Sequence, residues 1–245
     1  MSDVSLFIPC MVDALMPEIG ESVFRLLRRL DKKPVYHEEQ TCCGQPAISA
    51  GYNAPAIEAA KHFISIFEND EAIVSPSGSC VYTVKYDYPI LLADDPVWLK
   101  RSESLSNRVY ELSQYLVDVL GLSDVGSVFE GKVAFHESCK NLRGLGVSDQ
   151  PKKLLQGVRG TEVVPLNGAE ICCGFGGAFA VGYPEISEGM VKDKSTSFIE
   201  SGADRLILSE PGCLLNVSGY LEKHHPEKRA LHLASFLMES QEGGN

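Results

Sequence analysis

The sequence predicts an α/β protein made of two pseudo-symmetric βαβ-type halves, each with a parallel sheet and with cysteines at the carboxyl ends of its strands. Predicted strands alternate with predicted helices along the chain, which is typical of parallel sheets. The pattern C…CCG…C also occurs twice, with Cys42 and Cys172 about 130 positions apart. We therefore expect two domains, a first cysteine-rich CCG repeat over residues 1–122 and a second over residues 123–245.

The composition of the chain argues against some kinds of partner and indicates in which compartment the protein is expected. Of the 245 residues, 44% are hydrophobic, which is enough for a buried core without disulfide bonds. The net charge of −11, with Lys and Arg scattered along the chain, argues against a nucleic-acid partner. No apolar run is long enough for a membrane-spanning helix, and residues 1–4 do not resemble the start of a signal peptide. We expect a cytoplasmic protein, because free thiols persist in the cytosol.

The first half is expected to contain three short strands, each of which leads into a loop or helix. Apolar runs and strand-forming residues place these strands at residues 4–9, 34–37 and 71–74. Apolar residues at helical spacing predict helices at residues 23–30, 55–67 and 107–120. Pro55 is expected to begin the second of these helices, since proline is favoured at the first helical position. Residues 82–98 give no clear pattern.

The second half repeats this order of elements. Strands are predicted at residues 132–135, 161–166 and 204–208, and helices at residues 152–156 and 184–200. The ends of the two halves also match, because residues 108–116 resemble residues 229–237. The repeat therefore extends beyond the cysteines.

The cysteines follow predicted strands in both halves. Because the carboxyl ends of parallel strands meet at one edge of a sheet, we expect one four-cysteine site in each half. Small buried core residues are the alternative, but core cysteines would have no reason to follow strands in both copies. The expected ligands are Cys10, Cys42, Cys43, Cys80, Cys139, Cys172, Cys173 and Cys213.

Four thiolates can bind either a zinc ion or an iron–sulfur cluster. Structural zinc usually takes pairs of cysteines two to four residues apart, and neither half contains such pairs. Adjacent cysteines cannot easily bind one tetrahedral ion together, but they can bind two metals of a cluster. The glycine after each pair lets the backbone turn and direct N–H groups at sulfur. The residues favour an iron–sulfur cluster over zinc, and both over redox chemistry of a vicinal disulfide.

The repeated C…CCG…C pattern resembles the cysteine-rich CCG-domain family over nearly the entire chain. Further shared features are the segment Phe7–Cys10, Gln45-Pro46 after the first CCG, and Ser77–Cys80. The family includes iron–sulfur subunits of heterodisulfide reductase, glycolate oxidase and lactate-oxidising systems. A chain with only two CCG repeats is most similar to the lactate-oxidising members.

That resemblance implies an iron–sulfur electron-transfer subunit of a complex that oxidises L-lactate to pyruvate. The implied cofactor is [4Fe–4S], one or two per chain, with zinc as the alternative. The implied partners are two companion proteins, one of them ferredoxin-like. The resemblance also implies peripheral contact with a membrane electron acceptor. Alternative functions are an iron–sulfur subunit of a glycolate oxidase or heterodisulfide reductase-like complex, and a zinc-stabilised scaffold without a redox role.

The sequence departs from the heterodisulfide reductase pattern at one position of each repeat. There each repeat ends in C-x-x-C, whereas here Ser77 and Glu210 stand three residues before Cys80 and Cys213. Four-cysteine clusters are therefore expected in place of the five-thiolate, noncubane type. His136 and Glu210 are candidates for additional ligands at the second site.

The two sites are expected to differ. The second CCG loop contains more glycine, and His136 and Glu137 precede Cys139, whereas Pro9 precedes Cys10. Nearby ionisable groups and backbone donors shift the potential of a cluster. His37 and His62 are expected to be structural, and His224-His225 is assigned no role. The glycines after Cys173 are a poor dinucleotide-binding motif and are expected to form a turn around the site.

Overall fold

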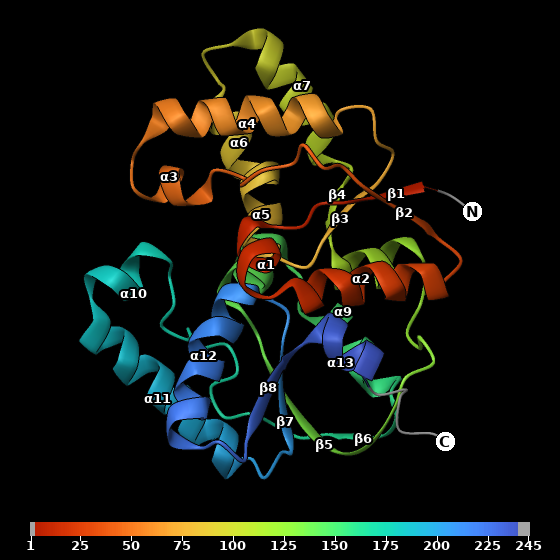
Figure 1. Ribbon diagram of the computed structural model, residues 1–245, viewed down its shortest axis with the longest axis vertical. Coiled ribbons are helices and arrows are strands. Elements are labelled where there is room, and N and C mark those ends of the chain that lie inside the picture. Colours follow the sequence, from red (N-terminus) through yellow and green to blue (C-terminus); the bar gives the residue numbers. More distant parts are fainter. Residues whose placement is uncertain (1–2, 240–245) are drawn as a thin grey trace. The chain divides into compact units, whose positions relative to one another are not determined.

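The computed structural model describes residues 3–239, and its internal contacts divide the chain into two units. Unit 1 comprises Met1–Leu112 and unit 2 comprises Ser113–Asn245. Each unit contains one four-stranded parallel sheet whose strands are joined by helical segments (Figure 1). The α/β architecture with two similar halves is therefore as the sequence predicts.

The sheet of unit 1 has the strand order β2-β1-β3-β4, and all of its neighbouring strands are parallel. In the central strand, Ser5 lies opposite Val35 on one side and Ile73 on the other. The strands are β1 (Asp3–Leu6), β2 (Lys33–Tyr36), β3 (Ile73–Ser75) and β4 (Val109–Glu111).

The helices of unit 1 supply most of its apolar core. Helix α2 buries Val23, Leu26 and Leu27, the face that the apolar spacing predicts. Helix α4 begins at Asn53, so Pro55 lies in its first turn, where the missing N–H has no intrahelical partner to lose. The helical segments are α1 (Cys10–Leu15), α2 (Pro17–Arg29), α3 (Gln45–Ser49), α4 (Asn53–Phe67), α5 (Gly78–Tyr82), the π-helical η1 (Thr83–Asp87), α6 (Tyr88–Leu91) and α7 (Pro96–Ser106).

The helix expected over residues 107–120 is wrong in its first part. Val109–Glu111 forms β4, which pairs with β3 so that Ile73 lies opposite Val109. Helical structure begins only at Leu112. Residues with apolar helical spacing therefore form an edge strand here, because pairing with a neighbouring strand outweighs local spacing.

Unit 2 repeats the topology of unit 1. Its strand order is β6-β5-β7-β8, again with all neighbours parallel. In β5, Phe135 lies opposite Ile207 of β7, and the pairing with β6 is irregular between Val128 and Gly131. The strands are β5 (Val128–His136), β6 (Arg159–Val163), β7 (Arg205–Leu208) and β8 (Arg229–His232).

The two longest helices of unit 2, α11 and α12, both lie near its cysteines. Helix α11 has the bounds that the sequence predicts, and it packs beside α12 (Figure 1). Helix α8 directly follows β4, and the boundary between the units falls after its first residue, Leu112. The helical segments are α8 (Leu112–Gln114), η2 (Tyr115–Val119), η3 (Lys140–Leu145), α9 (Asp149–Gln156), α10 (Ala178–Gly182), α11 (Pro184–Glu200), α12 (Pro211–His224) and α13 (Leu233–Glu239).

The strand order defines where each sheet can hold a ligand. In both sheets the first and third strands of the unit are neighbours at the centre, and the chain leaves them towards opposite edges. Parallel sheets of this kind bind ligands outside the carboxyl ends of the strands at such a reversal of strand order. That point lies after β1 and β3 in unit 1 and after β5 and β7 in unit 2.

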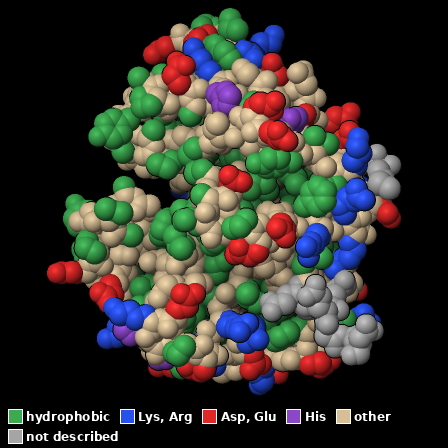
Figure 2. Space-filling model, in the orientation of Figure 1, with side chains coloured by type: hydrophobic (Ala, Val, Ile, Leu, Met, Phe, Trp, Pro, Cys, Tyr) green, Lys and Arg blue, Asp and Glu red, His purple; other side chains and the backbone are tan. Residues whose placement is uncertain are grey.

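The surface is mixed in charge. Figure 2 shows acidic and basic side chains interspersed over the visible face. None of the helices within residues 3–239 combines the length and the apolar character needed to cross a membrane.

Candidate functional site

Unit 1 brings its four cysteines together at the carboxyl end of the sheet. Cys10 begins α1 just after β1, and Cys80 lies in α5 just after β3. Cys42 and Cys43 lie in the loop after β2. The Cys42 thiol is within hydrogen-bonding reach of Cys10 and Cys43, and Cys43 also reaches Cys80. The four sulfurs therefore form one continuous cluster.

Unit 2 repeats this cluster. Cys139 directly precedes η3 after β5, Cys213 lies in the first turn of α12 after β7, and the vicinal pair lies in the loop after β6. The contacts run in the same order, from Cys139 to Cys172, then to Cys173 and Cys213. All eight cysteines are free thiols.

Each cluster has a buried side and a side that faces solvent. Cys43 and Cys80 are buried, as are Cys173 and Cys213. The other two thiols of each unit are exposed or partly exposed. Each site is therefore anchored in its unit and accessible on one side.

A left-handed glycine shapes both CCG loops. Gly44 has φ +81° and Gly174 has φ +86°, a conformation that other residues rarely adopt. The N–H of Gly44 donates to Cys42 Sγ at 3.4 Å, and that of Gly174 donates to Cys172 Sγ at 3.4 Å. The expectation that the glycine turn directs an N–H group at sulfur is confirmed in both halves.

The contacts among the thiols polarise each cluster. Donation from Cys10 and Cys43 lowers the pKa of Cys42 to about 2, and the equivalent donors in unit 2 lower the pKa of Cys172 to about 2. Donation to Cys42 and burial raise the pKa of Cys10 above its usual range. Each site thus favours a thiolate at the first cysteine of the vicinal pair. Deprotonation of Cys10 and Cys43 is opposed, because close thiolates repel each other.

A side chain from the helices after the third strand holds each CCG loop. In unit 1 the Tyr88 hydroxyl donates to the Cys43 carbonyl at 2.8 Å. In unit 2 the Asn216 amide donates to the Cys173 carbonyl at 2.9 Å. Neither residue belongs to a sequence motif, and an alignment of the two repeats would not have found them, because they differ in type and position.

Aromatic side chains lie behind the four cysteines of unit 1. Phe7 lies three residues before Cys10, and its ring meets that of Phe63 edge to face at 4.7 Å. The Tyr88 ring continues this group at 5.8 Å from Phe63. Phe7, Phe63 and Tyr88 are each at most 1% exposed, so the surroundings behind this cluster are apolar.

Polar side chains back the second cluster. His136 lies three residues before Cys139 and is fully buried, and its Nδ1 lies 3.0 Å from the Ala169 carbonyl oxygen. Lys194, on α11, is 3% exposed, and its ammonium donates to the carbonyls of Gly168 and Ala169. His136, Cys173 and Cys213 have donor atoms within 4.8 Å of one another, so the structure brings this histidine to the site.

The pKa of Cys213 reflects this polar environment. Donation from Cys173 lowers it to about 6, and His136 beside the sulfur acts in the same direction. Lys194 was missed by the sequence reasoning. A usable signal was present, however, because Lys194 lies on the buried face of α11 between Val191 and Phe198.

Ser77 and Glu210 have the same place in the two repeats. Both directly precede a helix with extended backbone, at φ −134° and ψ 109° for Ser77 and φ −129° and ψ 116° for Glu210. The Ser77 hydroxyl accepts a hydrogen bond from Cys80 N at 3.5 Å. Glu210, three residues before Cys213, is 8% exposed.

The remaining histidines in unit 1 lie in structural contacts. His37 Nε2 is 2.8 Å from the Asp70 carboxylate, and the ring meets Phe67 edge to face. His62 Nε2 is 2.9 Å from the Glu39 carbonyl oxygen. Neither residue belongs to the cysteine cluster, as the sequence analysis expected.

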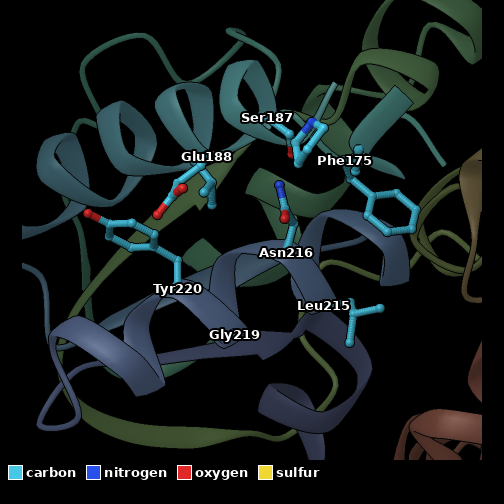
Figure 3. Close-up of a pocket in the computed structure, with 10 residues that line it drawn as sticks. Phe175, Ser187, Glu188, Leu215, Asn216, Gly219 and Tyr220 are labelled. Atoms are coloured by element: carbon cyan, nitrogen blue, oxygen red, sulfur yellow. The ribbon is translucent and has the colours of Figure 1, made fainter. Parts of the chain in front are cut away.

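A pocket of about 360 Å³ lies between α11 and α12 beside the second CCG loop (Figure 3). Phe175 directly follows this loop, and Asn216 connects the pocket to it through the Cys173 carbonyl. Figure 3 shows Asn216 pointing from α12 towards α11, with Glu188 and Tyr220 at the opposite end from Phe175. The Glu188 carboxylate disfavours an anionic ligand in this pocket through like-charge repulsion.

The donor set fits an iron–sulfur cluster in both units. Four free thiols converge, two of them anchored in the interior, and an N–H group already points at one sulfur. Thiolates are the usual ligands of such clusters, and N–H donors to sulfur stabilise their negative charge. Cys10, Cys42, Cys43 and Cys80 would hold one cluster, and Cys139, Cys172, Cys173 and Cys213 the other.

Known proteins provide independent comparisons. The model of the CCG cysteine-rich domain matches residues 4–85 and 133–218, one match in each half. A protein of Oceanobacillus iheyensis named Lactate utilization protein A is 43% identical over 241 residues, which cover 98% of each chain. A protein of the same name from Exiguobacterium sp. is 44% identical, also over 98% of each chain.

Similarity to a solved structure extends to the fold alone. A hypothetical protein from Helicobacter pylori superposes with a TM-score of 0.63 at 12% sequence identity. The match covers 99% of this chain but 49% of that protein. With both repeats matched by the domain model and relatives similar over nearly their full length, this chain belongs to the CCG cysteine-rich domain family.

Proposed function

We propose that this chain binds an iron–sulfur cluster at each four-cysteine site and acts as an electron-transfer subunit in the oxidation of L-lactate to pyruvate. The observation that carries the proposal is the convergence of four free thiols at the reversal of strand order in each unit. The name of its relatives, Lactate utilization protein A, supports lactate as the substrate of the system.

The chain's own residues account for holding and insulating such a group. The buried thiols Cys43 and Cys173 anchor it, and the glycine N–H groups offset the charge on sulfur. A bound [4Fe–4S] cluster supplies one-electron transfer, whereas lactate oxidation releases two electrons and two protons. The exposed side of each site allows a redox partner to approach.

The proposed partners are two companion proteins of the same system, one of them ferredoxin-like. The ferredoxin-like companion would exchange electrons with this chain, and a membrane electron acceptor would be reached through peripheral contact. A location in the cytoplasm agrees with eight free thiols.

Metal and sulfide analysis of anaerobically purified protein tests the proposal. We expect iron and acid-labile sulfide in a ratio near one, with a brown colour that is lost in air. Cys43→Ser and Cys173→Ser should each remove the iron of one site and leave that of the other. One zinc per site without sulfide would contradict the proposal and support a structural scaffold.

Lactate-dependent reduction of the protein, with its companions present, tests the substrate. We expect Cys173→Ser to abolish electron transfer at least as fully as Cys43→Ser, because the ionisable side chain of His136 lies beside the second site. Loss of activity in the Cys43→Ser variant alone would contradict this order. Glycolate-dependent reduction without a response to lactate would reassign the substrate.

A further inference from the structure

Behind the second cluster lies a buried lysine that has an aromatic counterpart in the first unit. We propose that the charge of Lys194 raises the reduction potential of the second site above that of the first, so that the second site holds electrons more strongly. This inference rests on the proposed function, since it concerns clusters bound at these sites.

The correspondence between Lys194 and Phe63 follows from how the CCG glycines pack. A Cβ on Gly44 would meet Ala59 of α4, and a Cβ on Gly174 would meet Met190 of α11. These two helix positions are therefore equivalent. One helical turn further, four residues on, are Phe63 in α4 and Lys194 in α11.

The same exchange occurs where the first strand of each unit leads into its site. Phe7 and His136 both lie three residues before the first cysteine of their unit, and both are fully buried. In unit 1 the two counterparts form the edge-to-face pair Phe7–Phe63. In unit 2 His136 and Lys194 instead both contact the Ala169 carbonyl oxygen. An apolar pair has thus been replaced by a pair that contains a cation.

Lys194 acts on the cluster through its charge. Burial lowers the pKa of Lys194, and its electrostatic interactions with Cys172, Cys173 and Cys213 act in the opposite direction. Its carbonyl partners are uncharged, and Glu170, the carboxylate that also acts on it, is exposed and therefore screened by solvent. An anionic cluster beside the ammonium would further favour its protonated form.

The direction of the effect follows from the charge balance of reduction. One-electron reduction adds one negative charge to a cluster and neither forms nor breaks a bond to the protein. A buried positive charge stabilises the more negative reduced state, and potentials of iron–sulfur clusters depend on local charge and burial. The apolar Phe63 offers no such stabilisation to the first site.

Redox titration followed by electron paramagnetic resonance tests the inference, with Cys43→Ser and Cys173→Ser used to isolate each cluster. In otherwise native protein the second site should have the higher potential. Lys194→Met should lower the reduction potential of the second site by about 59 mV, which for one electron is about a tenfold fall in the equilibrium constant for reduction. Lys194→Arg should retain most of the native value. Lys192→Met, which removes an exposed lysine of the same helix, is the matched control and should change little.

Lys194→Gln provides a second neutral variant in case the methionine variant folds poorly. Its amide can still donate a hydrogen bond to a loop carbonyl. Equal potentials at the two native sites would overturn the inference, as would an unchanged potential in both neutral variants at native iron content. An equal fall in Lys194→Arg would show that packing, not charge, sets the potential. If the native chain carries no cluster at all, the proposed function fails first, and this result is distinguishable by iron analysis alone.

Discussion

His136 and Lys194 share one hydrogen-bond acceptor, the carbonyl oxygen of Ala169, which lies 3.0 Å from His136 Nδ1 and 3.3 Å from Lys194 Nζ. Because a carbonyl can only accept, Nδ1 carries a proton. Nε2 is buried without a nitrogen or oxygen partner among the described residues, and it lies on the side of Cys213. The imidazole therefore presents its second nitrogen to the cluster.

Replacing His136 with phenylalanine should change the second cluster and leave the first unaltered. The variant introduces the residue type of the first unit and removes the nitrogen that faces sulfur, so the electron paramagnetic resonance spectrum and potential of the second site should shift. His224→Gln, on the exposed end of α12, is the control. Identical spectra in native protein and His136→Phe, at equal iron content, would show that Nε2 does not act on the site.

Gly174→Ala should destabilise the protein more than Gly44→Ala. Both positions have positive φ, which alone costs an alanine about 1 kcal/mol. The added Cβ would lie 2.7 Å from the Ser187 carbonyl oxygen in the second unit, but 3.1 Å from the Ala59 methyl group in the first. Overpacking of this kind adds about 1–3 kcal/mol, so Gly174→Ala should also lose iron from the second site.

Urea unfolding under anaerobic conditions measures the difference. Gly202→Ala is the matched control, because Gly202 has φ +70° with no atom within 4 Å of the added Cβ. In Gly202→Ala the free energy of unfolding should fall only by the cost of placing an alanine at positive φ. Equal losses for Gly174→Ala and Gly202→Ala would mean that the loop moves away from α11 at no cost.

The sequence could predict the sheet edges that hold the cysteines, because each cysteine follows a short apolar run and parallel strands end on one side. It could also predict the glycine turn, since a positive φ and a close helix both demand glycine. Both features are local or follow directly from topology. The convergence of Cys10 with Cys42 is an example, because β1 and β2 are neighbouring parallel strands.

Features that depend on tertiary packing could not be predicted in this way. Val109–Glu111 has helical spacing but pairs with β3, and only the presence of that neighbour makes it a strand. Asn216 reaches the second CCG loop from α12, and its partner is a backbone carbonyl without a sequence signature. The spacing of Lys194 places it on the buried face of α11, but its carbonyl partners Gly168 and Ala169 have no such signature either. Whether the eight thiols bind a cluster stays a prediction.

Asp95→Asn should lower the melting temperature at neutral pH, and the difference should vanish in acid. Lys61 donates to the Asp95 carboxylate at 3.0 Å, and this contact lowers the pKa of Asp95 below its ordinary value of 3.8. A carboxyl group whose pKa is lowered on folding stabilises the protein above the unfolded pKa, and loses this effect as pH falls through the folded pKa. Asparagine still accepts the N–H of Trp98 as a helix cap, so the variant isolates the charge.

Melting curves between pH 7 and pH 3, recorded as differences from native protein, provide the measurement. Asp94→Asn, at the exposed neighbouring position, should show a smaller difference at every pH. A deficit in Asp95→Asn that is constant across this range would contradict the charge pairing with Lys61.

Glu210→Cys should supply a fifth thiolate to the second site. The Ser77 hydroxyl, at the equivalent position, already reaches the backbone N–H of Cys80, so a side chain here lies beside the last cysteine of the repeat. The extended backbone at Glu210 suits cysteine without strain. A carboxylate is a harder donor than thiolate, so the exchange should strengthen binding of iron and could shift the cluster towards the five-thiolate, noncubane type.

Iron, sulfide and the electron paramagnetic resonance spectrum would be compared in native protein, Glu210→Cys and Glu210→Gln, with Ser77→Cys as the matched change in the first unit. Unchanged spectra and unchanged lactate turnover in both position-210 variants would show that this position lies outside the site.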